Sequence, residues 1–576
     1  MRTVLRSKDF RRIEQIPRRD WTTEYVSQFE RLSEALRTPS GTMNLRMVQA
    51  CALTEIGLQG GLFAPIGVGH GKTLVSLLAP NMTSCERPLL IVPAQLRLVT
   101  VSKYCQELSK HWHIPSSFCD GSRIISYGSL STKKGLNLLE ELNPDLIICD
   151  EVHYLKAASA ARTKRFLRYM RANPETKFVA MSGTVTKKSI REYWHLLKLA
   201  LPVDCPLPLR WVEMSDWANA LDENVRPELR TAPGALRYLC SDNETPRDGY
   251  RRRLTETRGV MATRESELGT SLVIMKHSPK VPPAINAALR RLRVDWVTPG
   301  GEDVSDSLDF YRKARELAYG YYYRWIWDVR VSQYQKETWL RARSEWRQLV
   351  RQESRKPQTD TELLVWNAYS SGVLDRDREV FEAWRSIKET TPPPKTEAVW
   401  FCDKMLKGLN LGKEPCLVWV DSKALAEKLV TMYGLPYYGA GQNDTKRLLS
   451  HIDTKAGHGI VSIRAHGTGK NLQAYSMSLV LTPPGSGAAW EQLLGRLHRP
   501  GQNADEVLFK VWTHTKELRA SFEQALADAS YIETTLGSKQ KLSYANILHW
   551  DSVDKKTKRG ESQAENLKSQ NGETKL

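Results

Sequence analysis

The sequence lacks three features that mark secreted or membrane proteins. Its nine cysteines are scattered singly and none forms a Cys-x-x-Cys pair, so neither a disulfide framework nor a zinc site is expected. No stretch approaches the roughly 18 consecutive apolar residues that a membrane-spanning helix needs. The first residues, Met1–Lys8, lack the apolar core of a secretory signal. We therefore expect a reduced, intracellular setting and no membrane partner.

The chain is long and basic. Its 576 residues exceed the size of a single hydrophobic core, so two or three domains are expected. The 84 Lys and Arg residues outnumber the 65 Asp and Glu residues, which gives a formal net charge of +19. An excess of this size favours a polyanionic partner.

A glycine-rich segment in the first half is typical of a phosphate-binding loop. The segment Gly69–Thr73 reads Gly-His-Gly-Lys-Thr and precedes the helix-like Leu74–Leu78. Glycines at a strand end let backbone N–H groups close around phosphates, and the following helix directs its positive end at the same charge. Lys72 would neutralise the β- and γ-phosphates, and Thr73 would hold Mg²⁺ through its hydroxyl. The alternative is a chance glycine turn.

Two carboxylates follow an apolar strand further along. Asp150 and Glu151 come directly after Leu146–Cys149, and ligands bind at the carboxyl ends of strands in open α/β sheets. Asp150 could therefore reach Mg²⁺, and Glu151 could polarise the attacking water. The alternative is a solvated turn, which the upstream phosphate loop makes the weaker interpretation.

The strand Lys177–Met181 is expected beside the Asp150 strand. It ends in Ser182-Gly183-Thr184, whose hydroxyls could sense the γ-phosphate or simply form a turn. His153 alone would more often be a loop or core histidine than a functional one.

Two arginines three residues apart lie in the second half. Arg496 and Arg499 stand in Glu491–Gln502, among glycine and polar residues that do not suit a core. Guanidinium groups are permanently charged and pair with phosphate oxygens in a planar fork. Both arginines are therefore candidate phosphate ligands.

Between the halves, aromatic residues alternate with arginines. One helical face is predicted to carry Leu308, Tyr311, Leu317, Tyr321, Trp325 and Val329. A pair of long helices with aromatic packing is the plain interpretation. The alternative is that exposed arginines follow a DNA backbone. The prolines of Thr390–Lys395 indicate a stiff linker and a domain boundary.

The order of the motifs resembles that of superfamily-two helicases, and the details look closest to the Swi/Snf type of double-stranded DNA translocase. The resemblance rests on Leu45–Gln49, Gly69–Thr73, Asp150–Lys156, Ser182–Thr184, Gly467–Leu472 and Gln492–Gln502. The last of these, ending in Arg-Pro-Gly-Gln, is the most specific. Two positions depart from the pattern, because Val185 replaces the usual proline and Ile66 replaces a small or acidic residue.

The resemblance implies an α/β fold of two tandem RecA-like parallel-sheet domains with an α-helical insertion between them. The expected boundaries are residues 1–40 for an N-terminal helical extension, 41–205 for the ATP-binding first domain, 206–390 for the insertion, 391–550 for the second domain and 551–576 for a disordered basic tail.

The resemblance also implies ATP and Mg²⁺ as cofactors and assigns roles to individual residues. The implied catalytic residues are Glu151, Asp150, Lys72, Arg496, Arg499 and Gln492. ATP would be bound by Gln49, which would read the adenine edge, and by Gly69, Gly71, Lys72, Thr73 and Gly469. Mg²⁺ would be bound by Thr73 and Asp150, and hydrolysis would be coupled to movement by His153, Ser182 and Thr184.

The predicted function is that of a DNA-dependent ATPase of helicase superfamily two. ATP would be hydrolysed in a cleft between the two domains while the protein tracks along duplex DNA, remodelling protein–DNA complexes or replication, recombination or repair intermediates. The alternatives are a strand-separating DNA or RNA helicase and a DNA-binding adaptor with a vestigial ATPase. No nuclease or chromatin-reading motif is evident in the sequence. We expect a monomer in the cytoplasm of a bacterial or virus-infected cell rather than in a nucleus.

Overall fold

The computed structural model describes residues 2–549 apart from 20–23, 187, 224, 263–269, 303, 305–306, 354–358, 360–361 and 468. The tail predicted for 551–576 lies outside the described residues. The chain forms two compact units, each assembled from separated segments. Unit 1 comprises Met1–Glu265, Ile326–Lys395 and Asp528–Gln540, and unit 2 comprises Ser266–Trp325, Thr396–Ala527 and Lys541–Leu576.

Unit 1 is built on a five-stranded sheet in the order β2-β6-β5-β3-β4, in which every pair is parallel. Its strands are β2 (Leu62–Ala64), β3 (Pro88–Val92), β4 (Ile124–Ser126), β5 (Leu146–Asp150) and β6 (Lys177–Met181). Parallel strands need crossover connections, which place helices on both faces of the sheet. Successive residues therefore enter different cores: Leu89 and Ile147 pack on one side, and Leu90 and Ile148 on the other.

Helices fill both of these cores. The core that contains Leu90 includes residues of α3 (Met47–Gln59) and α4 (Lys72–Leu78). The core that contains Leu89 includes residues of α1 (Lys8–Gln15), α9 (Ala161–Ala172), α10 (Trp194–Ala200), α11 (Trp211–Leu221) and α12 (Pro246–Thr255). The shorter or more peripheral elements are α2 (Glu24–Leu36), α5 (Ala94–Val99), α6 (Gln106–Leu108), α7 (Ser116–Cys119), α8 (Leu138–Leu142) and the parallel pair β1 (Arg2–Thr3) and β7 (Thr231–Ala232).

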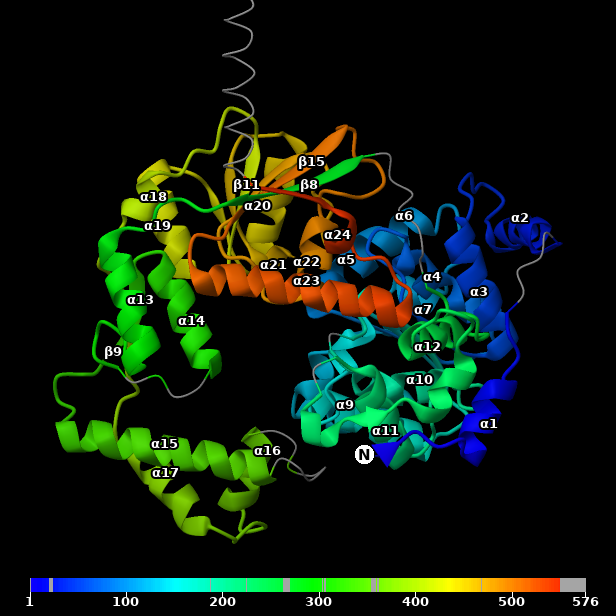
Figure 1. The fold of residues 1–576 in the computed structure, drawn as a ribbon, viewed down its shortest axis with the longest axis horizontal. Helices are drawn as coiled ribbons and strands as arrows, with labels where there is room; N and C mark the ends of the chain where they lie inside the picture. Colours follow the sequence, from blue (N-terminus) through cyan, green and yellow to red (C-terminus); the bar gives the residue numbers. More distant parts are fainter. Residues whose placement is uncertain are drawn as a thin grey trace, which may run out of the picture. The chain divides into compact units, whose positions relative to one another are not determined.

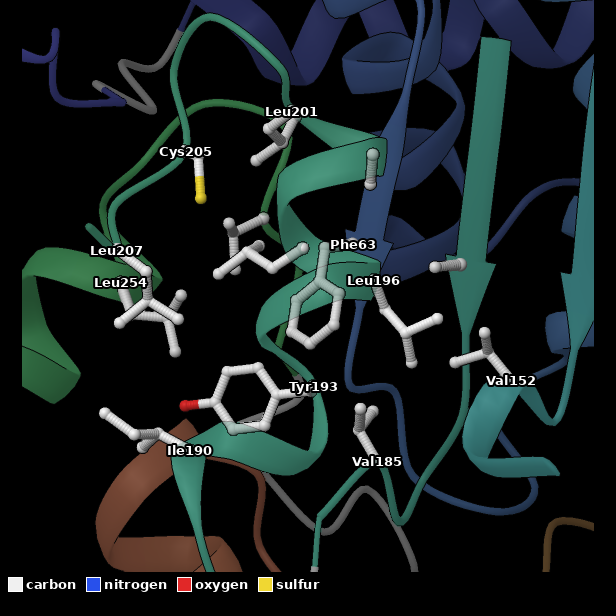
Figure 2. Packing of buried hydrophobic residues seen from close by; sticks show 14 of the residues in the cluster. Phe63, Val152, Val185, Ile190, Tyr193, Leu196, Leu201, Cys205, Leu207 and Leu254 are labelled. Atoms are coloured by element: carbon white, nitrogen blue, oxygen red, sulfur yellow. The ribbon is translucent and has the colours of Figure 1, made fainter. Parts of the chain in front are cut away.

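Figure 2 shows part of the second of these cores. Phe63 of β2 lies among Tyr193 and Leu196, and all three are buried. Val152 and Val185, which follow the ends of β5 and β6 closely in sequence, belong to the same core. The segments that leave the two strands are thus held by apolar packing.

Unit 2 is built on a seven-stranded, all-parallel sheet in the order β12-β13-β11-β14-β15-β8-β16. Its strands are β8 (Ser271–His277), β11 (Cys416–Val420), β12 (Tyr437–Tyr438), β13 (Gly459–Ser462), β14 (Met477–Val480), β15 (Glu506–Trp512) and β16 (Asn546–His549). Its helices are α13 (Pro283–Asp295), α14 (Ser307–Ala318), α18 (Lys404–Lys407), α19 (Lys423–Tyr433), α20 (Gln442–Asp453), α21 (Ile463–His466), α22 (Gly487–Leu494) and α24 (Lys541–Tyr544). The predicted fold class, α/β with two parallel-sheet domains, is confirmed.

The prediction that 206–390 forms a single insertion is wrong. Strand β8 pairs with β15 along its whole length, and Figure 1 shows the two side by side although more than two hundred residues separate them. Helices α11 and α12 contribute to the core of unit 1. The local pattern of 206–390 could not reveal this, because strand pairing across such a separation leaves no mark in the nearby sequence.

The helical face predicted across 308–329 is wrong beyond Ala318. There α14 ends, Gly320 takes a left-handed φ of 81°, and a Cβ at Gly320 would collide with the Cys402 carbonyl. The aromatic run that follows forms β9 (Tyr321–Ile326), which pairs with β10 (Lys395–Trp400). Aromatic side chains favour a pleated strand, so a glycine stop followed by tyrosines outweighs the helical spacing.

After β9 the described residues of this region form three helices, α15 (Gln333–Glu353), α16 (Glu362–Ser370) and α17 (Arg378–Thr390). Its aromatic side chains pack on one another: Trp346 contacts Trp366, Tyr369 and Phe381, and Trp339 contacts Trp384. Aromatic packing between helices therefore accounts for the tryptophans. Among all the described helices, none is both long and apolar enough to cross a membrane.

The last long helix, α23 (Lys516–Leu536), ends in unit 1. Ile532 and Leu536 are fully buried in the core that contains Phe63. Tyr531 Oη donates a hydrogen bond of 2.7 Å to Asp222 Oδ1. Residues that follow nearly all of unit 2 in sequence thus complete the core of unit 1.

We expect Ile532→Ala to lower the free energy of unfolding of unit 1 by about 2–5 kcal/mol, because it leaves a cavity in a close-packed core. Urea denaturation followed by tryptophan fluorescence measures the change. Ser530→Ala, at an exposed position of the same helix, is the matched control and should leave the midpoint unchanged. An unchanged midpoint for Ile532→Ala would mean that α23 does not belong to this core.

Candidate active site

The loop between β2 and α4 has the geometry of an anion cradle. Gly69 and Gly71 have φ values of 96° and 76°, which glycine adopts without the steric cost of a Cβ. Lys72 opens α4, is buried, and donates from Nζ to the carbonyls of Ile66 and Gly67, both at 3.1 Å. Thr73 follows on the first turn and is half-buried.

The unusual Ile66 fits this loop. Its side chain is buried in the apolar core below the loop, while its carbonyl accepts the Lys72 hydrogen bond. The departure from the family pattern therefore removes no group that Lys72 uses.

The start of α3 lies against the same loop. Gln49 Nε2 donates to the Gly71 carbonyl at 3.3 Å, and Gln49 Oε1 accepts from the Arg46 backbone N–H at 2.8 Å. Arg46 Nη1 donates to the Gly69 carbonyl at 3.2 Å. Gln49 is thus placed beside the predicted phosphate loop, and its adenine-reading role stays a prediction. This contact of Arg46 with the loop was not predicted, although Arg46 belongs to the motif Leu45–Gln49.

Asp150 ends β5 as a buried carboxylate. It is 5% exposed, and within the described part of the chain its Oδ1 has no hydrogen-bond partner. Burial and the charge of Glu151 raise the pKa of Asp150 well above its usual range, and the charge of Lys72 opposes this rise. A buried oxygen of this kind suits a hard divalent cation such as Mg²⁺, which would supply the missing partner. The residue thus fits its predicted metal role.

Glu151 follows in a left-handed conformation, with φ 60° and ψ 51°. This backbone is uncommon for a residue other than glycine and persists where surrounding contacts hold it. Three such contacts involve Oε2 or Oε1. Ser182 Oγ donates to Oε2 at 3.0 Å, His153 Nδ1 lies 3.2 Å from Oε2, and Lys72 Nζ lies 3.9 Å from Oε1.

Two of the three predicted coupling residues, His153 and Ser182, meet at this carboxylate. His153 Nδ1 and Ser182 Oγ are 2.9 Å apart, so both side chains contact each other as well as Glu151. The Thr184 backbone N–H donates to Ser182 Oγ at 3.2 Å. Thr184 Oγ1 is buried and, among the described residues, has no hydrogen-bond partner. The structure thus brings together Lys72, Glu151, His153 and Ser182 from three separate motifs.

The turn after β6 also touches the phosphate loop. A Cβ on Gly183 would lie 3.3 Å from the Ile66 carbonyl oxygen and 3.4 Å from Gly67 Cα. The absence of a side chain at Gly183 permits this approach. Val185 is fully buried and packs in the core of Figure 2, so the residue that replaces the usual proline anchors the turn by apolar contact.

Two tyrosines that the sequence did not single out support the Glu151 turn. Tyr127 Oη donates to the Asp150 carbonyl at 2.9 Å. Tyr154 stacks on Tyr127 and on His153, with ring centroids 5.1 and 4.7 Å away, and its carbonyl accepts from Arg162 Nε at 2.7 Å. Tyr127 directly follows β4, and only the fold shows what it contacts.

In unit 2 the predicted residues form a second group. Arg496 is 4% exposed and donates to the Gln492 carbonyl, the Lys470 carbonyl and Gln492 Oε1 at 2.8, 2.9 and 3.2 Å. Gly469, with a φ of 77°, precedes Lys470, and Thr468 lies outside the described residues. Arg499 is half-buried. Arg496 therefore supports the local fold through Gln492 and Lys470, and the approach of both arginines to a phosphate stays a prediction.

Comparisons with known proteins give a distant likeness of fold. No family model and no curated protein matches the chain. Among solved structures, S. cerevisiae Dbp5 bound to RNA and ADP BeF3 is similar, with 10% identity, a TM-score of 0.40 and coverage of 96% of this chain and 99% of that chain. A single-residue variant of Dbp5 with the same ligands gives 10% identity, a TM-score of 0.38 and coverage of 93% and 97%. A likeness at this score carries no argument about function, so the site rests on the contacts described above.

We expect Asp150→Asn to raise the Tm of the metal-free protein by about 2–4 °C, because it neutralises a buried carboxylate that lacks a partner at Oδ1. Differential scanning calorimetry in EDTA at pH 8 measures this change. The same variant should lose Mg²⁺-dependent ATP turnover by at least about a hundredfold. Asp242→Asn, at an exposed position of unit 1, should change neither. A lower Tm for Asp150→Asn would show that Asp150 has a structural role instead.

Proposed function

We propose that this protein is an ATP hydrolase that converts hydrolysis into movement along nucleic acid, with duplex DNA as its track. The observation that carries the proposal is the convergence of Lys72, His153 and Ser182 on the Glu151 carboxylate. A phosphate-neutralising lysine beside a carboxylate that can accept a proton from water is the arrangement that phosphoryl transfer to water requires.

Lys72 and Glu151 act in sequence in this proposal. Lys72 Nζ leaves the carbonyls of Ile66 and Gly67 and binds the β- and γ-phosphates of ATP. Ser182 and His153 keep hold of Glu151 Oε2, so the carboxylate retains its orientation and accepts the proton of the attacking water. Asp150 and Thr73 would hold Mg²⁺, which would supply positive charge beside the β- and γ-phosphates when bound.

The turn after β6 links the phosphate to movement. Ser182 contacts Glu151, and Gly183 approaches the phosphate loop. A change in the loop on hydrolysis therefore reaches Ser182 and Thr184 directly. In the proposed cycle Arg499, with Arg496 supporting it, stabilises the charge that develops on the γ-phosphate, and closure of the two units lasts only while that phosphate is present. If the protein holds a nucleic-acid backbone during this cycle, each round of hydrolysis moves it one step along that backbone.

Duplex DNA is the proposed track for two reasons. The motif ending in Arg-Pro-Gly-Gln resembles that of double-stranded DNA translocases, and the charge of +19 suits a polyanionic partner. A strand-separating helicase on DNA or RNA and an adaptor with a vestigial ATPase are the competing functions, and each gives a different result in the next experiment.

We expect duplex DNA to raise the ATP turnover of the full chain by at least about tenfold, and more than single-stranded DNA or RNA does. A coupled ATPase assay with the three nucleic acids in parallel, together with strand displacement on a forked substrate, measures this. Lys72→Ala and Glu151→Gln should each lose at least about a hundredfold in turnover. Strand displacement would favour the helicase. Stimulation of ATP turnover by RNA alone would mean that the protein moves along RNA and not along DNA. ATP turnover that does not change with any nucleic acid would contradict the proposal of a motor.

Arg499→Ala should lower turnover by about a thousandfold or more, because it removes a positive charge proposed to act in the transition state. Binding of ATP and of DNA should remain within about threefold of the wild type, since Lys72 and the phosphate loop are unchanged. Arg519→Ala, at an exposed position of unit 2, is the matched control for loss of one positive charge. Wild-type ATP turnover in Arg499→Ala would show that Arg499 does not act in the proposed site.

A further inference from the structure

Unit 1 brings residues 2–11 against residues 226–238, although the two segments are far apart in sequence. Strand β1 runs parallel to β7, and Arg2 lies opposite Thr231 in this pair. Neighbouring strands are about 4.8 Å apart, so the backbone of Arg230, which directly precedes Thr231, is also close to that of Arg2. Both segments belong to unit 1, so the surface that they form needs no contribution from unit 2.

Six exposed side chains on these two segments carry a positive charge, and among the described residues none of the six has an ion-pair partner. They are Arg2, Lys8, Arg11, Arg226, Arg230 and Arg237. Two nearby arginines differ from them. Arg6 pairs with Glu14 at 3.1 Å, and Arg12 pairs with Asp9 at 2.7 Å. We call the six unpaired side chains the basic surface.

Acidic side chains on the two segments are too few to balance this charge. Together the segments contain seven Lys and Arg residues but only two acidic residues, Asp9 and Glu228. Asp9 is already paired, whereas Glu228 is exposed. On the neighbouring α11, the half-buried Glu213 accepts a hydrogen bond from Ser7 Oγ at 2.8 Å. The basic surface therefore retains a positive potential, which attracts an anionic partner.

Close contacts fix the backbone that carries these side chains. The Val4 N–H donates to the Ala232 carbonyl at 3.0 Å. Gly234 has a left-handed φ of 49°, and a Cβ at this position would collide with the Val4 carbonyl. Tyr238 is 65% exposed, and the Arg6 guanidinium lies 4.6 Å from its ring centroid. The two segments thus hold each other in place, which lowers the entropic cost of binding a partner.

We propose that the basic surface binds the phosphate backbone of duplex DNA. The inference deepens the proposed function and rests on it, because that function makes duplex DNA the track. Five of the six side chains are arginines, whose planar guanidinium groups pair with phosphate oxygens. Phosphates repeat along the duplex, so several can be neutralised at once, and the counterions that DNA releases contribute to affinity. Contacts with the backbone alone carry no sequence information, so binding here is independent of base sequence.

The combined variant Arg2→Ala, Arg230→Ala and Arg237→Ala tests the proposal with the full chain, a fluorescently labelled duplex and no nucleotide. Fluorescence anisotropy at low salt should show an affinity for DNA at least about tenfold weaker than that of the wild type. The slope of log affinity against log salt concentration should become less steep by about 2–3, since each phosphate contact contributes about 0.9. The Tm should stay within about 1 °C of the wild type, because all three side chains are exposed.

A second triple variant controls for a general loss of positive charge. It combines Arg31→Ala, Lys103→Ala and Arg171→Ala, three exposed positions of unit 1 outside the two segments. Its affinity for DNA should stay within about twofold of the wild type. Glu228→Gln, which removes the exposed carboxylate beside the basic surface, should raise the affinity for DNA about twofold.

Equal losses of affinity in the two triple variants would overturn the proposal. An unchanged affinity in the first triple variant would overturn it too, and would favour an acidic protein as the partner of the basic surface. The binding assay contains no ATP, so the two proposals can fail separately. Absence of ATP turnover in the wild type would refute the proposed function, whereas the comparison of DNA affinities decides this inference.

Discussion

Two carboxylates are buried side by side at the end of β5, and their charges need compensation from other residues of unit 1. Asp150 and Glu151 would repel each other and resist burial without compensation. Lys72 supplies the nearest positive charge, Ser182 and His153 hold one oxygen of Glu151, and the strained backbone of Glu151 is kept in place by Val152 beneath it. Asp150 Oδ1 remains without a hydrogen-bond partner among the described residues, and this is the oxygen proposed to bind Mg²⁺.

Much of unit 1 could be predicted because its signals are local. Apolar runs such as Leu146–Cys149 specify strands buried on both faces, and glycine at Gly69 and Gly71 specifies the loop. Strand β8 (Ser271–His277) was not predicted because its partner β15 lies far away in sequence. The local sequence contains no sign of that partner. The prediction for Tyr321–Ile326 was wrong for a different reason. The apolar residues there have helical spacing, but Gly320 separates them from α14.

The residues of the candidate site also fall into those that local sequence marks and those that it does not. Lys72, Asp150, Glu151 and Ser182 stand in short motifs whose chemistry is evident from residue type and order. Tyr127 acts through burial and through its hydrogen bond to the Asp150 carbonyl, so nothing in its local sequence marks it.

The docking of α23 into unit 1 has a consequence for biosynthesis. Ile532 and Leu536 belong to the same core as Phe63 and Val185, so a nascent chain cannot complete the core beneath the turn at Glu151 until residues 532–536 have left the ribosome. Arg496 and Arg499, the arginines proposed to act on the phosphate, precede these residues in sequence and have been synthesised by then. The core beneath the turn at Glu151 is thereby completed only after the arginines proposed to act on the phosphate exist.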